Sequence, residues 1–490
     1  MTRTGVLSPW SAFSIDRATT SRVAKSAGFV GRALLAALRA SGKTQGMSSD
    51  LPKPIYLRGQ SPDETVPFAG DQFDRKALAE RITGLLTRLP DGAVLSIDAP
   101  WGDGKTWFGR NWHASLVEAG YRTGFIDCFQ RDHIEDPFVM IAGELLHLPK
   151  KGAPQRRKKL VDASKKLGAA LLPSAAKFAA NTVGHWAIGK ADLGDDIAKS
   201  IAALEESSAA SLEKLVAKRL EAYEADKKSV DGFRNALRDL ASEGDKPIVI
   251  FLDELDRCRP DFAVRTVERV KHFFEVPGVV FVLLMNRSQL VAAIRGIYGE
   301  QIDAEAYLAK FIQLSLTLPK QIAVETHSPD DNQKHCDATM VRYGFGRTEG
   351  NQQFARLMGM LATALRFSLR DVERAVVLYS LAQPLNASAS DAAWPIALKL
   401  ARPELFSRLT RGEAKAHDEA HKFLISVRET AKSLTQSLAM FEAIHWAGSN
   451  NFEQPLPEDL NKLLGQRWAV HGPKRFMSWV LGRVDLDVAR

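Results

Sequence analysis

Two adjacent carboxylates, Asp253 and Glu254, have the residue types and the position that phosphate chemistry needs. They follow the apolar run Ile248–Leu252, which is typical of a fully buried strand. Ionised groups are costly to desolvate unless a cation or hydrogen bonds compensate, so buried strands seldom end in paired carboxylates without a reason. The pattern predicts a magnesium ligand at Asp253 and a water-activating base at Glu254. An acidic strand end that lies in solvent is the alternative interpretation.

A second motif lies upstream, where the segment 95–98 leads into a phosphate-binding loop that lacks only its usual first glycine. The loop consists of Ala99, Pro100, Trp101, Gly102, Asp103, Gly104, Lys105 and Thr106. The two glycines let backbone N–H groups come close to phosphate oxygens. Lys105 would reach the β- and γ-phosphates, and the Thr106 hydroxyl would bind magnesium. A Gly-containing turn before Lys-Thr is the alternative, but two such motifs rarely coincide in this order.

Together the two motifs resemble those of the KAP family of P-loop NTPases, in its bacterial form. The segments that carry the resemblance are Asp253–Cys258 with Pro260, Trp101–Thr106, Phe281–Asn286, and Tyr307–Gln313 with Leu318 and Pro319. The resemblance covers about residues 71–319. It implies a P-loop NTPase that uses ATP and Mg²⁺. The chain has no Asn-Lys-x-Asp guanine signature, which also favours ATP over GTP.

Two further side chains complete the predicted site. Asn286 stands where the family often has Asp, and it would position the attacking water or sense the γ-phosphate. Arg370 opens a predicted helix after the core and is the candidate for a phosphate-sensing arginine. An ordinary surface arginine paired with a carboxylate is the alternative for Arg370. The predicted catalytic set is therefore Glu254, Lys105, Asn286 and Arg370, with Thr106 and Asp253 as metal ligands.

Composition argues against a general electrostatic attraction to nucleic acid. The 490 residues carry a net charge of +8, of which +6 falls within residues 1–46, leaving about +2 for the rest. We interpret residues 1–50 as a disordered basic leader, with Met47 as a possible true start and a targeting signal as the alternative. The three scattered cysteines fit a reducing compartment and no disulfide framework.

The remaining pattern predicts an α/β fold, a three-layer P-loop NTPase with a parallel sheet. Short apolar segments at 93–97, 123–127, 248–253, 279–285 and 312–318 alternate with helical patterns. The expected organisation is an N-terminal part of the core at 51–147, a helical insertion at 148–243, a C-terminal part of the core at 244–320 and a helical domain at 321–490. Ligand would bind beyond the carboxyl ends of the strands.

The insertion opens with a basic cluster and continues into an Ala- and Leu-rich stretch, together spanning 150–189. The stretch is too polar for a confident membrane span, so a surface or interfacial helix is expected there, with a solvated helix as the alternative. We accordingly expect a cytoplasmic protein, with a peripheral position at the inner membrane as a further option.

The leading functional hypothesis is ATP hydrolysis coupled to a conformational change, acting on a protein partner or within a homo-oligomer. A nucleotide-gated scaffold with slow or absent hydrolysis is the first alternative, supported by Ala99. A DNA-handling ATPase is the second alternative. The resemblance to bacterial KAP proteins further implies a role in phage exclusion or mobile-element defence.

Overall fold

The computed structural model describes residues 65–148, 154–171, 227–320, 330–382 and 389–430, together with Leu438, Phe441, Glu442 and His445. The predicted leader at 1–50, the alternative start at Met47 and most of the Ala- and Leu-rich stretch of the insertion lie outside the described residues.

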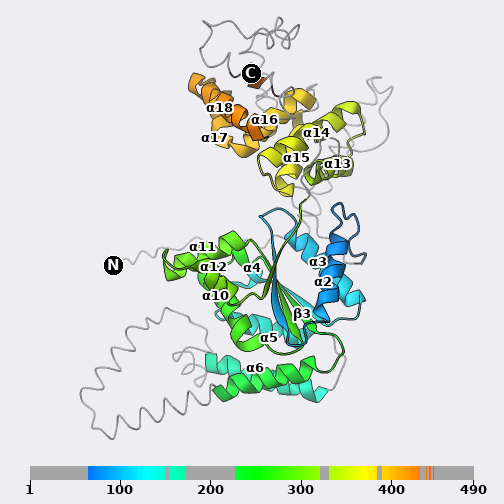
Figure 1. Cartoon of the computed structure of the whole chain (residues 1–490), viewed down its shortest axis with the longest axis vertical. Helices are drawn as coiled ribbons and strands as arrows, with labels where there is room; N and C mark the ends of the chain where they lie inside the picture. The colour runs from blue at the N-terminus through cyan, green and yellow to red at the C-terminus, as the bar shows by residue number, and fades with distance from the viewer. Residues whose placement is uncertain are drawn as a thin grey trace, which may run out of the picture. The chain divides into compact units, whose positions relative to one another are not determined.

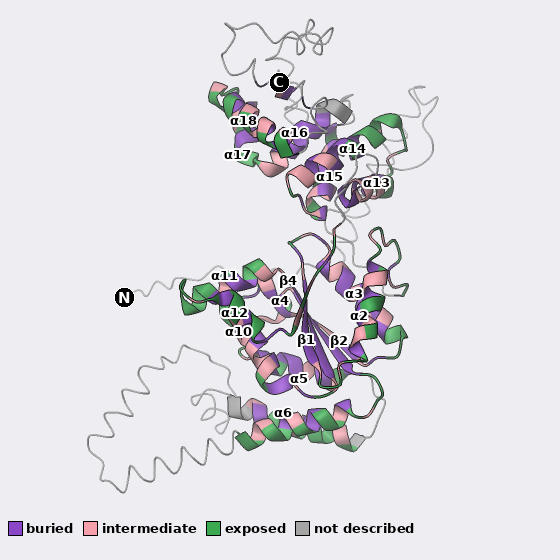
Figure 2. Ribbon diagram, viewed as in Figure 1, coloured by how far each residue is buried: buried purple, intermediate pink, exposed green. Residues whose placement is uncertain are grey.

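A five-stranded, entirely parallel sheet forms the centre of the fold (Figure 1). Its strands are β1 (Ala93–Asp98), β2 (Thr123–Asp127), β3 (Ile248–Asp253), β4 (Val279–Met285) and β5 (Leu314–Thr317), in the order β2-β3-β4-β1-β5. Every residue of β3 and β4 is buried, as expected for strands covered on both faces (Figure 2). The predicted α/β fold with a parallel sheet is confirmed. The fifth strand is shorter than predicted and pairs only with β1 at the edge of the sheet.

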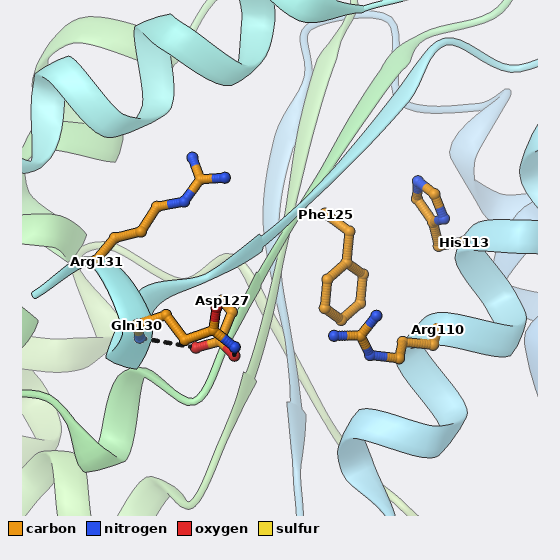
Figure 3. A pocket seen from close by; sticks show the side chains of 6 residues that line it. All are labelled: Arg110, His113, Phe125, Asp127, Gln130 and Arg131. Carbon is orange, nitrogen blue, oxygen red and sulfur yellow. Dashed lines mark hydrogen bonds between the residues drawn. The ribbon is translucent and has the colours of Figure 1, made fainter. Parts of the chain in front are cut away.

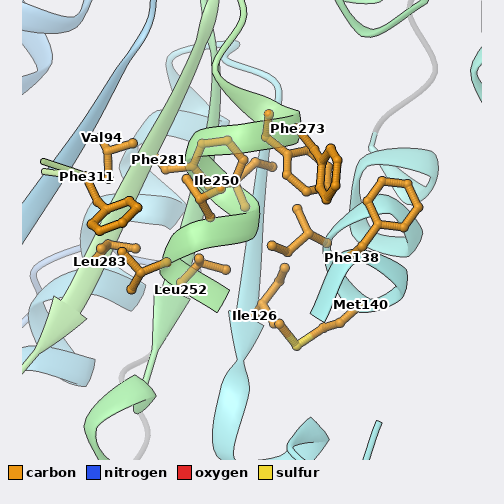
Figure 4. Packing of buried hydrophobic residues seen from close by; sticks show 14 of the residues in the cluster. Val94, Ile126, Phe138, Met140, Ile250, Leu252, Phe273, Phe281, Leu283 and Phe311 are labelled. Carbon is orange, nitrogen blue, oxygen red and sulfur yellow. The ribbon is translucent and has the colours of Figure 1, made fainter. Parts of the chain in front are cut away.

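Successive side chains of each strand point to opposite faces, and each face is covered by its own helices. On β3, Val249 and Phe251 lie in one hydrophobic cluster, whereas Ile250 and Leu252 lie in the other. Figure 4 shows Ile250 and Leu252 within the second cluster. The first face carries α2 (Arg75–Leu86) and α3 (Lys105–Glu118). The second face carries α5 (Pro137–His147), α10 (Pro260–Arg269), α11 (Arg287–Tyr298) and α12 (Ala304–Ala309). Short helical segments within the described core are α4 (Cys128–Arg131), η1 (Leu255–Arg257) and η2 (Val270–Phe274).

The described part of the insertion packs onto the core rather than standing away from it. Leu160 of α6 (Pro154–Leu171) and Phe233 of the helical segment 227–241 are fully buried in the same cluster as α5. Arg156 donates a hydrogen bond to the Asp239 carbonyl at 3.0 Å. The helices of the described ranges include none with the length and apolar character needed to span a membrane. Contact with a membrane surface stays a prediction.

In the described ranges 330–382 and 389–430, six helices share a separate hydrophobic cluster. They are α13 (Asp331–Arg342), α14 (Glu349–Ala364), α15 (Leu369–Ala382), α16 (Ala389–Ala401), α17 (Pro403–Thr410) and α18 (Ala414–Thr430). The rings of Phe354 and Tyr379 stack at 3.8 Å between centroids, which joins α14 to α15. The helical character predicted after the core is therefore present, while the domain limits given above remain predictions.

Candidate functional site

The two predicted motifs meet at the carboxyl edge of the sheet. Asp253 ends β3 and lies opposite Asp127, the last residue of β2, while Asp98 ends β1. Asn286 follows β4 directly, and the phosphate loop begins at Ala99, directly after β1. Because all five strands are parallel, their carboxyl ends lie along one edge. The topology thus gathers the acidic strand end, the loop and Asn286 in one place.

The phosphate loop connects β1 to α3 through two residues with left-handed backbone conformations. Gly102 has φ +88° and Gly104 has φ +83°, values that a residue with a Cβ adopts only with strain. The Lys105 ammonium donates to the carbonyls of Ala99 and Pro100, at 2.6 and 3.2 Å. Burial lowers the pKa of Lys105, and the nearby carboxylates of Asp256, Asp253 and Asp98 oppose that shift. Together these contacts hold the ammonium group against the loop.

Thr106 and Asp253 form the link between the loop and the acidic strand end. The Thr106 hydroxyl hydrogen-bonds the Asp253 carboxylate, which is 2% exposed. Burial raises the pKa of Asp253 to about 6, and the bond from Thr106 acts in the opposite direction. A hydroxyl beside a carboxylate is an all-oxygen donor pair. Mg²⁺ uses such a pair when it keeps several waters and substrate phosphates as further ligands, so these residues fit that ion.

No cluster of three His, Cys, Asp or Glu side chains suited to a metal ion occurs among the described residues.

Glu254 is held in an unusual conformation directly beside Asp253. Its φ is +57°, a left-handed value that costs a non-glycine residue about 1–2 kcal/mol. Its N–H donates to the Asp253 carboxylate at 2.9 Å, and its own carboxylate forms an ion pair with Arg257 at 2.8 Å. Burial raises the pKa of Glu254, while the charges of Arg257 and Arg370 lower it. Backbone strain of this kind is concentrated at functional sites.

The other two predicted catalytic residues lie at the starts of two different helices, α11 and α15. The Asn286 side-chain oxygen accepts a hydrogen bond from the Ser288 hydroxyl at 2.8 Å, at the start of α11. Arg370 is exposed, and its backbone N–H donates to the Gly102 carbonyl at 3.3 Å. Its charge is close enough to lower the pKa of Glu254. The structure therefore brings Arg370 to the loop although 268 residues of sequence separate it from Gly102.

Two contacts of the loop were not predicted from the sequence. The Trp101 indole N–H donates to the Asp256 carboxylate, which ties the loop to the turn after β3. Arg75, at 4% exposure, donates to the carbonyls of Asp103 and Gly104 at 2.9 and 3.4 Å. Arg75 opens α2, 28 residues before Asp103, so its sequence position gave no signal of this role.

A cavity of about 270 Å³ adjoins the acidic edge at β2 (Figure 3). Its lining comprises Arg110, His113, Phe125, Asp127, Gln130 and Arg131. The Arg110 guanidinium stacks over the Phe125 ring at 4.8 Å, and Asp127 accepts hydrogen bonds from Gln130. None of the eight loop residues lines this cavity, so it is a neighbour of the predicted site and not the site itself.

The parallel sheet, the loop between β1 and α3, and the Asp253–Glu254 pair define a nucleotide-binding P-loop NTPase. The chain belongs to the KAP family, because the model of the KAP family P-loop domain matches residues 75–376, more than half of its length. The resemblance inferred from the two motifs is thereby confirmed.

The remaining comparisons add little to this assignment. No curated protein matches the chain. Among solved structures, the Aeropyrum pernix ORC2 protein in its ADPNP–ADP complexes is similar, with 11% sequence identity and a TM-score of 0.34. That match covers 90% of this chain and 100% of the other. A likeness at this level supports no functional argument.

Proposed function

We propose that this KAP-family chain binds ATP and hydrolyses it, and that hydrolysis drives a conformational change. The observation that carries the proposal is that the phosphate loop after β1 and the Asp253–Glu254 pair at the end of β3 lie at the same carboxyl edge of the parallel sheet. The Thr106 hydroxyl is near enough to lower the pKa of the Asp253 carboxyl, and Glu254 is the next residue. Phosphoryl transfer to water needs these three groups side by side.

Each of the chain's own residues has a separate task in this proposal. Backbone N–H groups of the loop and the Lys105 ammonium would bind the β- and γ-phosphates and stabilise the charge that develops on the transferred group. Glu254 would orient the attacking water and accept a hydrogen bond from it. Asn286 would position that water, and Arg370 would contact the γ-phosphate from the start of α15.

Magnesium would be held by Thr106 and Asp253. When bound, it would supply positive charge that offsets the negative charge of the nucleotide phosphates. Desolvation raises the pKa of Asp253 to about 6, so the chain alone holds this carboxylate in an environment that disfavours its charge. A carboxylate in such an environment gains from a cation partner.

Nucleotide binding tests the first half of the proposal. We expect titration with a fluorescent ATP analogue to give saturable binding that depends on magnesium. The Lys105→Ala variant should lose at least tenfold in affinity, whereas Lys76→Ala, an exposed lysine in the first turn of α2, should bind as the wild type does. An unchanged affinity in Lys105→Ala would contradict the placement of the phosphates in this loop.

Two observations favour a nucleotide-gated scaffold as the second candidate. Ala99 replaces the first glycine of the loop, and it is buried at 2% exposure. The Glu254 carboxylate is already paired with Arg257 at 2.8 Å. Under this alternative, wild type and Glu254→Gln would bind ATP equally, and phosphate release would be equally slow or absent in both. Turnover by the wild type that Glu254→Gln loses would exclude it.

The biological setting rests on the family alone. A role in phage exclusion or mobile-element defence, at or near the inner membrane, is what the KAP resemblance supports. The exposed lysines Lys158 and Lys159 of α6 are compatible with an anionic membrane surface. Binding to vesicles with and without anionic lipid would test the membrane contact. Salt-sensitive binding of DNA by the purified chain would instead support the DNA-handling alternative.

A further inference from the structure

The Asp103 side chain connects the phosphate loop to the chain that follows the core. Its carboxylate accepts hydrogen bonds from the Leu369 backbone N–H at 3.1 Å and from the Lys320 ammonium at 3.4 Å. The same ammonium donates to the Phe367 carbonyl at 2.8 Å. Asp103 is only 8% exposed and its contact with Leu369 is buried, whereas the Lys320 side chain is 25% exposed. Hydrogen bonds to a charged, shielded acceptor are among the stronger ones in proteins.

The loop backbone makes a second contact with the same segment. The Arg370 N–H donates to the Gly102 carbonyl at 3.3 Å. A Cβ placed on Gly102 would lie 2.6 Å from the Ser368 hydroxyl oxygen and 3.0 Å from the Arg370 Cβ. The loop and residues 368–370 are therefore packed so closely that only glycine fits at position 102.

The segment that Asp103 contacts is itself tightly organised. Ser368 and Asp371 form a reciprocal cap at the start of α15: the Ser368 hydroxyl donates to the Asp371 carboxylate at 2.7 Å, and the Asp371 N–H donates to the Ser368 hydroxyl at 3.3 Å. The Ser368 N–H also donates to that carboxylate, at 3.2 Å. Leu369 and Arg370 lie inside this cap. A shift of Leu369 would consequently move Arg370 with it.

On the loop side, Arg75 holds the backbone to which the Asp103 side chain is attached. Its guanidinium donates to the Asp103 carbonyl at 2.9 Å and to the Gly104 carbonyl at 3.4 Å. Arg75 is 4% exposed, and its guanidinium carbon lies 4.9 Å from the centroid of the Phe73 ring. Supporting contacts of this kind fix the geometry of a functional loop. Both ends of the Asp103–Leu369 contact thus have defined positions.

We infer that Asp103 is a positioning residue that holds Arg370 beside Glu254, and that it thereby couples the phosphate loop to α15. The inference rests on the proposed function, because Arg370 acts there on the γ-phosphate. Coupling of this kind is reciprocal: phosphates that order the loop would order the start of α15, and a partner that moves α15 would change the affinity of the loop for nucleotide.

The carboxylate has two separable properties that variants can remove in turn. Asp103→Asn keeps an oxygen that can accept the Leu369 N–H but loses the charge that pairs with Lys320. Asp103→Ala loses both and leaves the two donors without this acceptor. Asp91, an exposed acid in the turn before β1, provides the matched control in Asp91→Ala.

A double-mutant cycle on phosphate release tests whether Asp103 acts through Arg370. We expect Asp103→Ala and Arg370→Ala each to lower turnover at least tenfold, and the double variant to fall no more than about threefold below the worse single variant. Asp103→Asn should be intermediate, and Asp91→Ala unchanged. Losses that multiply in the double variant would overturn the inference, because the two residues would then act independently.

Hydrogen exchange of the nucleotide-free chain gives a second readout that needs no catalysis. We expect the Leu369 amide to exchange at least tenfold faster in Asp103→Ala than in the wild type and in Asp91→Ala. Thermal unfolding of each variant would show that the fold is retained. Unchanged exchange at Leu369 would overturn the inference even if the chain is an ATPase. A wild type without turnover would instead remove the proposed function, while exchange would still decide whether Asp103 holds the segment.

Discussion

At the scale of single residues, the site depends on backbone conformations as much as on side-chain types. Glu254 has φ +57° and Gly102 has φ +88°, and both flank the place where phosphates would bind. The strain at Glu254 is offset by its N–H bond to Asp253 and its ion pair with Arg257. Gly102 has no strain to offset, because it lacks a Cβ.

Replacing Gly102 tests how closely the loop and the start of α15 pack. Gly102→Ala should lower ATP affinity at least tenfold and destabilise the fold by about 1 kcal/mol or more, because its Cβ would lie 2.6 Å from the Ser368 hydroxyl oxygen. Gly84→Ala is the control: the Gly84 site is an exposed position within α2 with nothing within 4 Å, and there alanine should stabilise by up to about 1 kcal/mol. Calorimetry and nucleotide titration measure both effects. Wild-type affinity in Gly102→Ala would refute the close packing.

The sequence predicted the residue types of the site better than their contacts. Lys105, Thr106, Asp253 and Glu254 are recognisable because phosphate loops and acidic strand ends have fixed local spacing. The support from Arg75 and the contact of Asp103 with Leu369 join residues that are distant along the chain. Local pattern carries no information about such pairs. The capping pair Ser368–Asp371 was the one local signal near Arg370, since a Ser followed three residues later by an acid is typical of a helix start.

At the scale of elements, the apolar faces of the helices account for the packing. The helices α2 and α3 bury their apolar side chains on one face of the sheet, and α5, α10 and α11 do so on the other. Caps decide where a helix begins. The helix α14 begins at Glu349, where the Thr348 hydroxyl accepts the Asn351 N–H. Hydrophobic spacing alone does not show such caps.

The attachment of α6 to the core can be measured by stability. Leu160 is 1% exposed within the main hydrophobic cluster, so Leu160→Ala should lower the free energy of unfolding by about 2–5 kcal/mol. Lys159→Ala, next to it but exposed, should change that energy by less than about 0.5 kcal/mol. Urea unfolding of both variants provides the comparison. Equal stabilities would mean that α6 does not pack as described.

A buried histidine makes the helices after the core sensitive to acid. Burial, followed by the charges of His417 and His421, holds the pKa of His445 well below its usual value, and its ring nitrogen accepts the Trp394 indole N–H at 3.0 Å. The unfolded chain therefore binds a proton at His445 below about pH 6.5 that the folded chain does not bind. The contribution of His445 to the free energy of unfolding should therefore be complete above that pH and should be lost progressively on acidification.

The free energy of unfolding of the wild type should fall by roughly 1 kcal/mol between pH 7.5 and pH 5.5. The fall should be smaller in His445→Gln. The exposed His147 serves as the control, and His147→Gln should keep the wild-type pH dependence. Chemical unfolding of each variant at pH 7.5 and pH 5.5 measures this change in the free energy of unfolding. An identical pH dependence in wild type and His445→Gln would show that His445 is not the group responsible.

At the scale of the whole molecule, the nucleotide motifs come from distant parts of the chain. The loop at 99–106 and the acid pair at 253–254 flank the insertion, and Arg370 arrives from beyond the core. Parallel strand order brings the first two together, because β3 is separated from β1 only by β4. The fold class was predictable from alternating strands and helices. The contact of α15 with the loop was not predictable from the sequence, because this contact joins two different hydrophobic clusters.

The most direct test of the central claim is phosphate release in a single turnover of magnesium-ATP, measured for the wild type and for Glu254→Gln. The proposed function predicts release by the wild type. It predicts near wild-type ATP binding by Glu254→Gln with release slowed at least about a hundredfold, as expected when a general base is removed. Hydrolysis by Glu254→Gln at the wild-type rate would contradict the assignment of the water-activating carboxylate, and with it the mechanism proposed for this site.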